Sequence, residues 1–165
     1  MTKWLKTPVV KATTDPETED TIENGQSFFF VRSSSGVAGD TVTLAGEVVP
    51  LASNPEYPVV PGSTTAMAYP WPISFKIKDF NQFNANPKGS ASIGGTADQI
   101  WTYDGFTWTK YFFYDARGVQ KWLKTPVVKA TTDLETEDEI AVGQAFFFVR
   151  SSSGTAADKI VFKQL

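Results

Sequence analysis

Two short stretches of the chain are rich in carboxylates that could bind a metal ion. The first contains Asp15, Glu17 and Glu19, and the second contains Asp133, Glu135 and Glu137. Calcium takes about six to eight oxygen ligands, so both stretches are candidate calcium loops. Neither has the D-x-D-x-D-G spacing that wraps one ion, and a solvated acidic loop between strands is the favoured interpretation. We expect no metal and no cofactor.

Four aromatic residues within residues 99–114 could bind a sugar: Trp101, Tyr103, Trp108 and Tyr111. Their flat faces suit the C–H groups of a pyranose ring. The alternative is a core of cross-strand aromatic pairs, which is the favoured interpretation for any single ring. Because both faces of this segment carry aromatic residues, one face could still bind a sheet, a subunit or a polysaccharide.

The sequence Arg-Ser-Ser-Ser-Gly occurs twice, at 32–36 and at 150–154, and its hydroxyls and amides could hold an anion. It lacks the Lys and the second Gly of a phosphate-binding loop, and no helix is predicted to follow it. A polar turn that closes a buried strand is therefore favoured.

Composition excludes several classes of function. The chain has no His and no Cys, so it has no imidazole base, no thiol nucleophile and no zinc–thiolate site. It also lacks a G-x-S-x-G motif, and we expect that it is not an enzyme. Its 15 basic and 18 acidic residues give a net charge of −3, which predicts no nucleic-acid partner. It contains no run of about 20 apolar residues, which predicts no membrane insertion.

A duplication is the most informative feature of the chain. Residues 4–36 match residues 122–154 at 28 of 33 positions. The second copy follows the aromatic segment 99–120, whereas no such segment precedes the first, which therefore resembles the back half of a module. We predict a partial repeat over 1–49 and a main β module over 50–165, in which residues 119–165 contain the second copy. One continuous domain with pseudo-twofold symmetry is the alternative.

The expected elements are short strands. Asp104-Gly105 lies between two aromatic strands and predicts a hairpin. The alternation over 73–80 predicts a strand, and Pro126 predicts an edge strand broken at that residue. Further strands are expected at 28–31, 41–49 and 146–149. With no sustained helical period, the pattern favours an all-β fold, an antiparallel sandwich or barrel with the duplicated segment at its two ends.

Several of these pieces together resemble a known group of proteins. The pieces are Tyr69-Pro70-Trp71-Pro72, Ala97 to Asp115, Trp122, Ile140 to Gly154 and Thr41 to Val48. Their spacing and aromatic residues are similar to those of poorly characterised secreted or cell-surface β-rich repeat proteins of bacteria. The resemblance implies a β architecture and an extracellular or cell-surface location, and it includes no catalytic signature.

A half-module leaves a hydrophobic face or a sheet edge that needs a partner. The first hypothesis is therefore a structural subunit that assembles head to tail with copies of itself into a filament or surface array, by strand complementation. The expected assembly residues are Trp4, Val9, Val10, Phe28, Phe29, Phe30, Trp122, Phe146, Phe147 and Phe148. The alternative hypothesis is a carbohydrate-binding or adhesion module that uses the aromatic hairpin 99–114.

Overall fold

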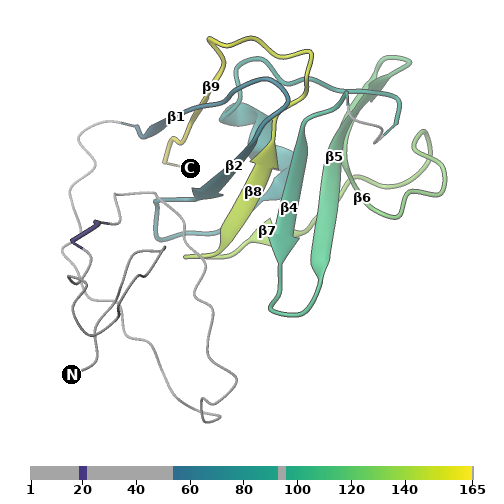
Figure 1. The fold of residues 1–165 in the computed structure, drawn as a ribbon. Helices are drawn as coiled ribbons and strands as arrows, with labels where there is room; N and C mark the ends of the chain where they lie inside the picture. Colours follow the sequence, from purple (N-terminus) through teal and green to yellow (C-terminus); the bar gives the residue numbers. More distant parts are fainter. Residues whose placement is uncertain (1–18, 22–53, 93–95, 165) are drawn as a thin grey trace, which may run out of the picture.

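The computed structural model describes residues 19–21, 54–92 and 96–164, and strands dominate this part of the chain (Figure 1). The prediction of an all-β fold is confirmed. The described strands are β1 (Glu56–Pro58), β2 (Thr64–Ala68), β3 (Phe75–Lys76), β4 (Gln99–Tyr103), β5 (Trp108–Ala116), β6 (Val119–Lys124), β7 (Glu139–Ile140), β8 (Ala145–Val149) and β9 (Lys159–Val161). The described residues include one helical element, the 3₁₀ helix η1 (Ile77–Gln82). The strands expected at 28–31 and 41–49 lie outside the described residues.

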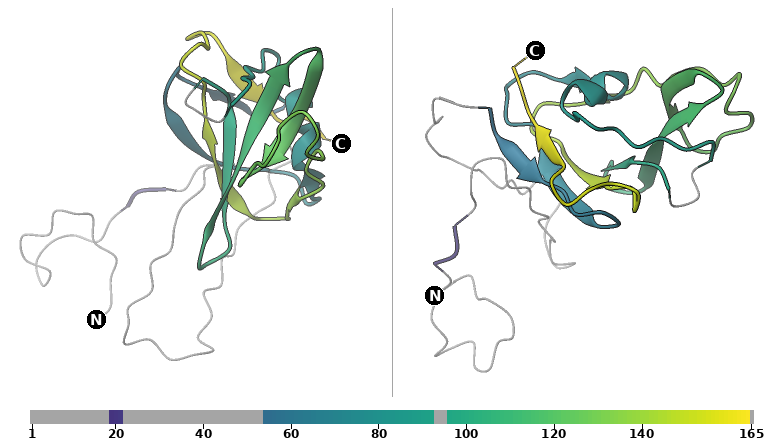
Figure 2. Two further views of the ribbon diagram at one scale, coloured as in Figure 1. Left: turned by 90° about the vertical axis from the view of Figure 1, so that its right-hand side faces the viewer. Right: turned by 90° about the horizontal axis from the view of Figure 1, so that it is seen from above.

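The strands form one five-stranded sheet and two small sheets. The large sheet has the order β2-β8-β4-β5-β6, and the small sheets pair β1 with β9 and β3 with β7. All of these strand pairs are antiparallel. The small sheets and η1 surround a core on one side of the large sheet (Figure 2).

Two tight turns organise the right-hand part of the large sheet in Figure 1. The predicted hairpin joins β4 to β5, and the Asp104 carboxylate accepts N–H bonds from Phe106 and Thr107 at 2.8 Å each. Arg117 and Gly118 join β5 to β6 with positive φ angles of 57° and 74°, as a two-residue type I′ turn requires. The predicted edge strand is β6, which ends at Lys124, before Pro126.

The segment 73–80 differs from its predicted strand. Pairing with β7 is limited to β3, and the chain then enters η1. Ile77, Phe80 and Phe83 are spaced by three residues, so the three-residue period of a 3₁₀ helix directs all of them to one buried face. Burial of these side chains determines the local structure, and the alternating pattern upstream does not extend into a longer strand.

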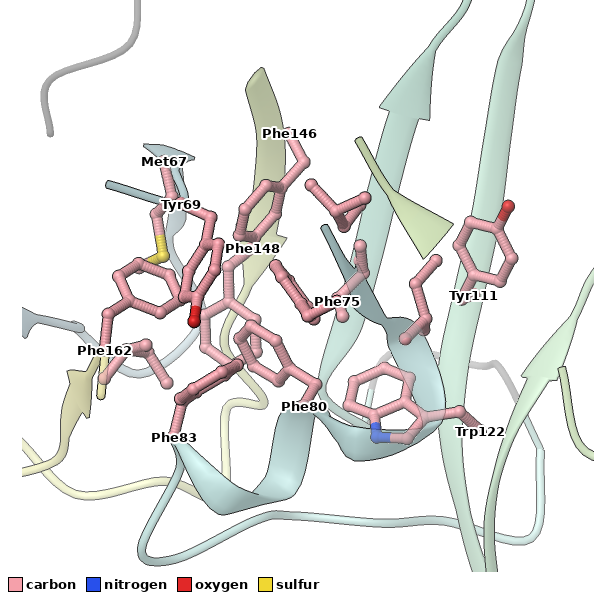
Figure 3. Packing of buried hydrophobic residues seen from close by; sticks show 14 of the residues in the cluster. Met67, Tyr69, Phe75, Phe80, Phe83, Tyr111, Trp122, Phe146, Phe148 and Phe162 are labelled. Atoms are coloured by element: carbon pink, nitrogen blue, oxygen red, sulfur yellow. The ribbon is translucent and has the colours of Figure 1, made fainter. Parts of the chain in front are cut away.

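Aromatic side chains fill the core beneath the large sheet (Figure 3). Phe80 of η1 lies 5.3 Å from Phe148 of β8 and 5.8 Å from Trp122 of β6, measured between ring centroids. The Trp122 indole N–H donates to the Asn81 Oδ1 at 3.1 Å, which satisfies its one polar group. The core thus joins η1 to β6 and β8, two strands that come much later in the sequence.

Candidate assembly site

The described module consists of two interlocked halves of the chain. We call residues 54–116, apart from 93–95, the acceptor half, and residues 119–164 the inserted half. The acceptor half supplies β1 to β5 and the inserted half supplies β6 to β9. Strand β8 lies between β2 and β4, while β9 pairs with β1, β7 with β3 and β6 with β5. Removing the inserted half would therefore open the large sheet between β2 and β4 and leave both edges unpaired.

The expected assembly residues of the second copy are at the centre of this junction. Phe146 and Phe148 are fully buried against the acceptor half, and so is Trp122. Phe147 points to the other face of the large sheet, because successive side chains of a strand alternate. The other expected assembly residues, Trp4, Val9, Val10, Phe28, Phe29 and Phe30, lie outside the described residues.

A buried ion-pair cluster, formed by Asp98, Arg150 and Asp158, joins the two halves. The Arg150 side chain is fully buried, and its Nη1 donates to the Asp98 Oδ2 at 2.7 Å. Its Nη2 donates to the Asp158 carboxylate and to the Asn86 carbonyl. A buried guanidinium is stable only when such partners are present, so the cluster depends on correct docking of both halves.

Asp98 is the acceptor half's contribution to this cluster. Besides the Arg150 bond, its carboxylate accepts N–H bonds from Ser151 at 2.9 Å, from Lys88 at 3.0 Å and from the Asn84 amide at 3.0 Å. Burial raises the pKa of Asp98, and the Ser151 and Lys88 N–H bonds and the Arg150 charge oppose that rise. The anion beside the second Arg-Ser-Ser-Ser-Gly sequence is thus a carboxylate of the protein itself.

The inserted half contributes the second carboxylate of the cluster. Burial alone would raise the pKa of Asp158, but hydrogen bonds from Thr155, Asn86 and Arg150 outweigh this effect and lower it. Gly154 lies so close to Arg150 that an added Cβ would be 2.3 Å from the Arg150 Nε. The sequence analysis did not predict the ion pair; the available signal was an Arg followed eight residues later by an Asp in both copies, Arg32/Asp40 and Arg150/Asp158.

The predicted sugar-binding residues are divided between two faces of the large sheet. Tyr111 is only 4% exposed and belongs to the core, where its hydroxyl donates to the Asp138 Oδ2 at 2.8 Å, so it offers no stacking surface. Tyr103 and Trp108 are 38% and 44% exposed. The Trp108 ring centroid is 4.8 Å from that of Tyr103 and 5.4 Å from that of Phe147.

Trp101, which is half-buried, extends this aromatic row on the same face. The Lys110 Nζ lies 4.0 Å from the Trp101 ring centroid, and the indole N–H of Trp101 donates to the Gln99 Oε1 at 2.9 Å. We call Trp101, Tyr103, Trp108 and Phe147 the outer aromatic row. It is the predicted aromatic site without Tyr111 and with the addition of Phe147 from the inserted half.

The acidic residues of the second copy bind other groups of the protein. The Asp133 carboxylate accepts two backbone N–H bonds, at 2.9 and 3.0 Å, and Glu135 accepts the N–H of Trp122 at 3.1 Å. Glu137 pairs with Lys76 and Lys78. Within the described residues, no three Asp or Glu side chains are grouped as metal ligands would be. Asp15 and Glu17 lie outside those residues, and Glu19 is exposed.

Comparison with known proteins adds no relative: no family model, curated protein or solved structure matches the chain. Among the described residues, no helix is long and apolar enough to cross a membrane.

Proposed function

We propose that the chain is a structural β protein that assembles with copies of itself, joined through its duplicated segments at a cell surface or outside the cell. The observation that carries the proposal is the way the second copy docks. Residues 119–164 supply a central strand and part of the buried ion-pair cluster, so this segment type acts as a docking element.

The number of docking elements exceeds the number of acceptor halves. The chain carries two near-identical copies of the docking element, and the described part contains one acceptor half. One copy per chain therefore remains without that acceptor, and its apolar FFFV segment needs cover. A contact between such a copy and a different surface of a neighbouring chain is heterologous, and heterologous contacts that do not close produce open fibres.

Electron microscopy and light scattering across a concentration series test this proposal. We expect the full chain to form regular fibres or sheets as its concentration rises, and a chain lacking residues 1–36 to remain a monomer. The matched control carries Phe106→Ser at the exposed tip of the β4–β5 hairpin and should still assemble. A full chain that stays monomeric at every concentration, or a truncated chain that assembles normally, would contradict the proposal.

The outer aromatic row supports a second candidate function, the binding of a polysaccharide. The exposed rings of Tyr103 and Trp108 provide apolar faces, and Lys110 beside Trp101 is a charged neighbour on the same face. Trp108→Ala should abolish retention on a polysaccharide affinity gel while the far-ultraviolet circular dichroism stays unchanged. Trp122→Ala, at a fully buried tryptophan, is the control that should unfold the module. Unchanged retention of the Trp108 variant on the tested polysaccharides would exclude this function for them.

A further inference from the structure

The side chains that the inserted half buries in the acceptor half recur in the sequence of the N-terminal copy. Ten side chains of the inserted half are buried in the structure: Trp122, Leu123, Thr136, Ile140, Phe146, Phe148, Arg150, Ser151, Ile160 and Phe162. Eight of them recur unchanged 118 positions earlier; the exceptions are Val42 for Ile160 and Leu44 for Phe162. Both exceptions are smaller apolar residues, which fit the same space without a clash.

The differences between the copies fall where the structure tolerates them. Within the matched 33 residues the second copy differs at five positions: Leu134, Glu139, Ala141, Val142 and Ala145. The first four are exposed and the fifth is half-buried. None of the five differences therefore changes a side chain that is buried in the acceptor half.

The polar groups of the junction are repeated as well. Arg32 and Ser33 correspond to Arg150 and Ser151, the two residues that hold Asp98, and Asp40 corresponds to Asp158. Because a one-residue slip moves every side chain of a strand to the opposite face, Arg32 can reach Asp98 only in the register that the second copy uses. The N-terminal copy thus carries both the shape and the register signal of the inserted half.

The chain connectivity allows this docking within one molecule. Val161, near the end of the inserted half, is paired with Glu56 at the start of the acceptor half, and the Phe162 N–H donates to the Pro55 carbonyl at 3.0 Å. A segment that ends immediately before the acceptor half can therefore reach the place of β9 through a short connection. Residues 45–53 supply nine residues for it, which is below the length of about 12–15 residues at which connections in compact domains become uncommon.

From these observations we infer that residues 4–44 are an alternative occupant of the acceptor half of their own chain, in exchange with residues 122–162. Residues 4–116 would then form a circularly permuted version of the described module. The inference goes beyond the proposed function, because it concerns a single chain and holds whether or not chains assemble.

The exchange is biased toward the second copy. That copy is tethered by the two-residue turn at Arg117–Gly118, which gives it a high effective concentration at the acceptor half. Ile160 and Phe162 are also larger apolar residues than Val42 and Leu44, so they have more apolar surface to bury at this site. The described arrangement is therefore the major state, and removing Arg150 should shift the balance toward the N-terminal copy.

Disulfide trapping in the full chain tests the inference, and the absence of native cysteine makes it clean. Ala68 of β2 and Ala145 of β8 are directly opposite each other, within reach of a disulfide, and Ser27 is the N-terminal counterpart of Ala145. The control variant Ala68→Cys/Ala145→Cys reports the described arrangement. The test variant Ala68→Cys/Ser27→Cys reports docking of the N-terminal copy, and mass spectrometry of unreduced digests identifies each bond.

We expect the test variant to form a minor intrachain disulfide in dilute solution, and Arg150→Ala in the same chain to increase that fraction more than about tenfold. Adding Arg32→Ala should abolish the increase. If the cysteines introduced by Ser27→Cys and Ala68→Cys form no disulfide in the Arg150→Ala background, the inference is wrong. It is also wrong if that disulfide forms only between chains. The intrachain disulfide tests this inference, whereas an interchain disulfide between the same positions would support the proposed assembly. The two proposals can therefore fail separately.

Discussion

Replacing Asp98 by Asn tests the junction between the halves at its most demanding point. The amide keeps the shape of the carboxylate but replaces one acceptor oxygen with an NH₂ group. Asp98 accepts from four donors and is fully buried, so the variant leaves the Arg150 charge without one of its two carboxylate partners. Asp98 belongs to the acceptor half, and the described part of the chain contains one acceptor half. Neither copy of the duplicated segment can therefore replace the lost carboxylate.

The expected loss follows from the burial of the pair. Removing one partner of a buried ion pair costs about 3–5 kcal/mol, a large part of the roughly 5–15 kcal/mol that stabilises a domain. With an m-value of about 1–3 kcal/mol/M, the urea midpoint should fall by more than about 1 M.

Urea unfolding followed by far-ultraviolet circular dichroism and tryptophan fluorescence measures this loss. Asp115→Asn is the matched control, because Asp115 is exposed on neighbouring β5 and its change should cost less than about 0.5 kcal/mol. A loss below about 1 kcal/mol for Asp98→Asn would refute the role given to the ion-pair cluster.

Three further predictions concern other parts of the same module. Gly154→Ala should lower stability by about 1–3 kcal/mol in urea unfolding, because the new Cβ would displace the Arg150 side chain; no loss would show that the guanidinium can move freely. Phe148→Ala should cost about 3–5 kcal/mol and Phe147→Ala clearly less, because only Phe148 is fully buried; equal losses would contradict the assignment of faces on β8. Glu137 has a folded-state pKa lowered to about 2 from 4.5 by hydrogen bonds from Lys78 and Lys76, so its stabilising effect is present above pH 4.5 and is lost as the pH falls to about 2. Thermal melts of Glu137→Gln and the unchanged protein should therefore differ most above pH 4.5 and converge near pH 2; a difference that persists at pH 2 would exclude this titration as its cause.

Local features of the fold were predictable from the sequence, and non-local ones were not. The Asp104-Gly105 hairpin depends on neighbouring residues, and these two residues indicated where it lies in the chain. The position of β8 between β2 and β4 depends on contacts between residues more than 40 positions apart. The hydrophobic periodicity of the sequence does not show which distant strands pair. The segment 73–80 was mispredicted because Ile77 fits both the two-residue alternation with Phe75 and the three-residue period with Phe80.

The candidate site shows the same division. The apolar run of residues 146–149 predicted a strand, which the structure shows as β8, although only one of its two faces is fully buried. Tyr111 was misassigned to an exposed site because alternation predicts which residues share a face but not which face is covered. The partner of Arg150 could not be predicted, because Asp98 is 52 residues away in a polar segment with no motif of its own.

Hydrogen exchange of the full chain, followed by mass spectrometry across a concentration series, tests the central claim most directly. Peptides from the two copies are distinguishable, because Ser27 in one stands for Ala145 in the other. The account predicts that amides of 146–149 are protected at every concentration, because β8 is a central strand. It also predicts that protection of amides 28–31 increases with concentration as neighbouring chains cover them. Amides 28–31 that exchange freely at every concentration would contradict assembly through the duplicated segments.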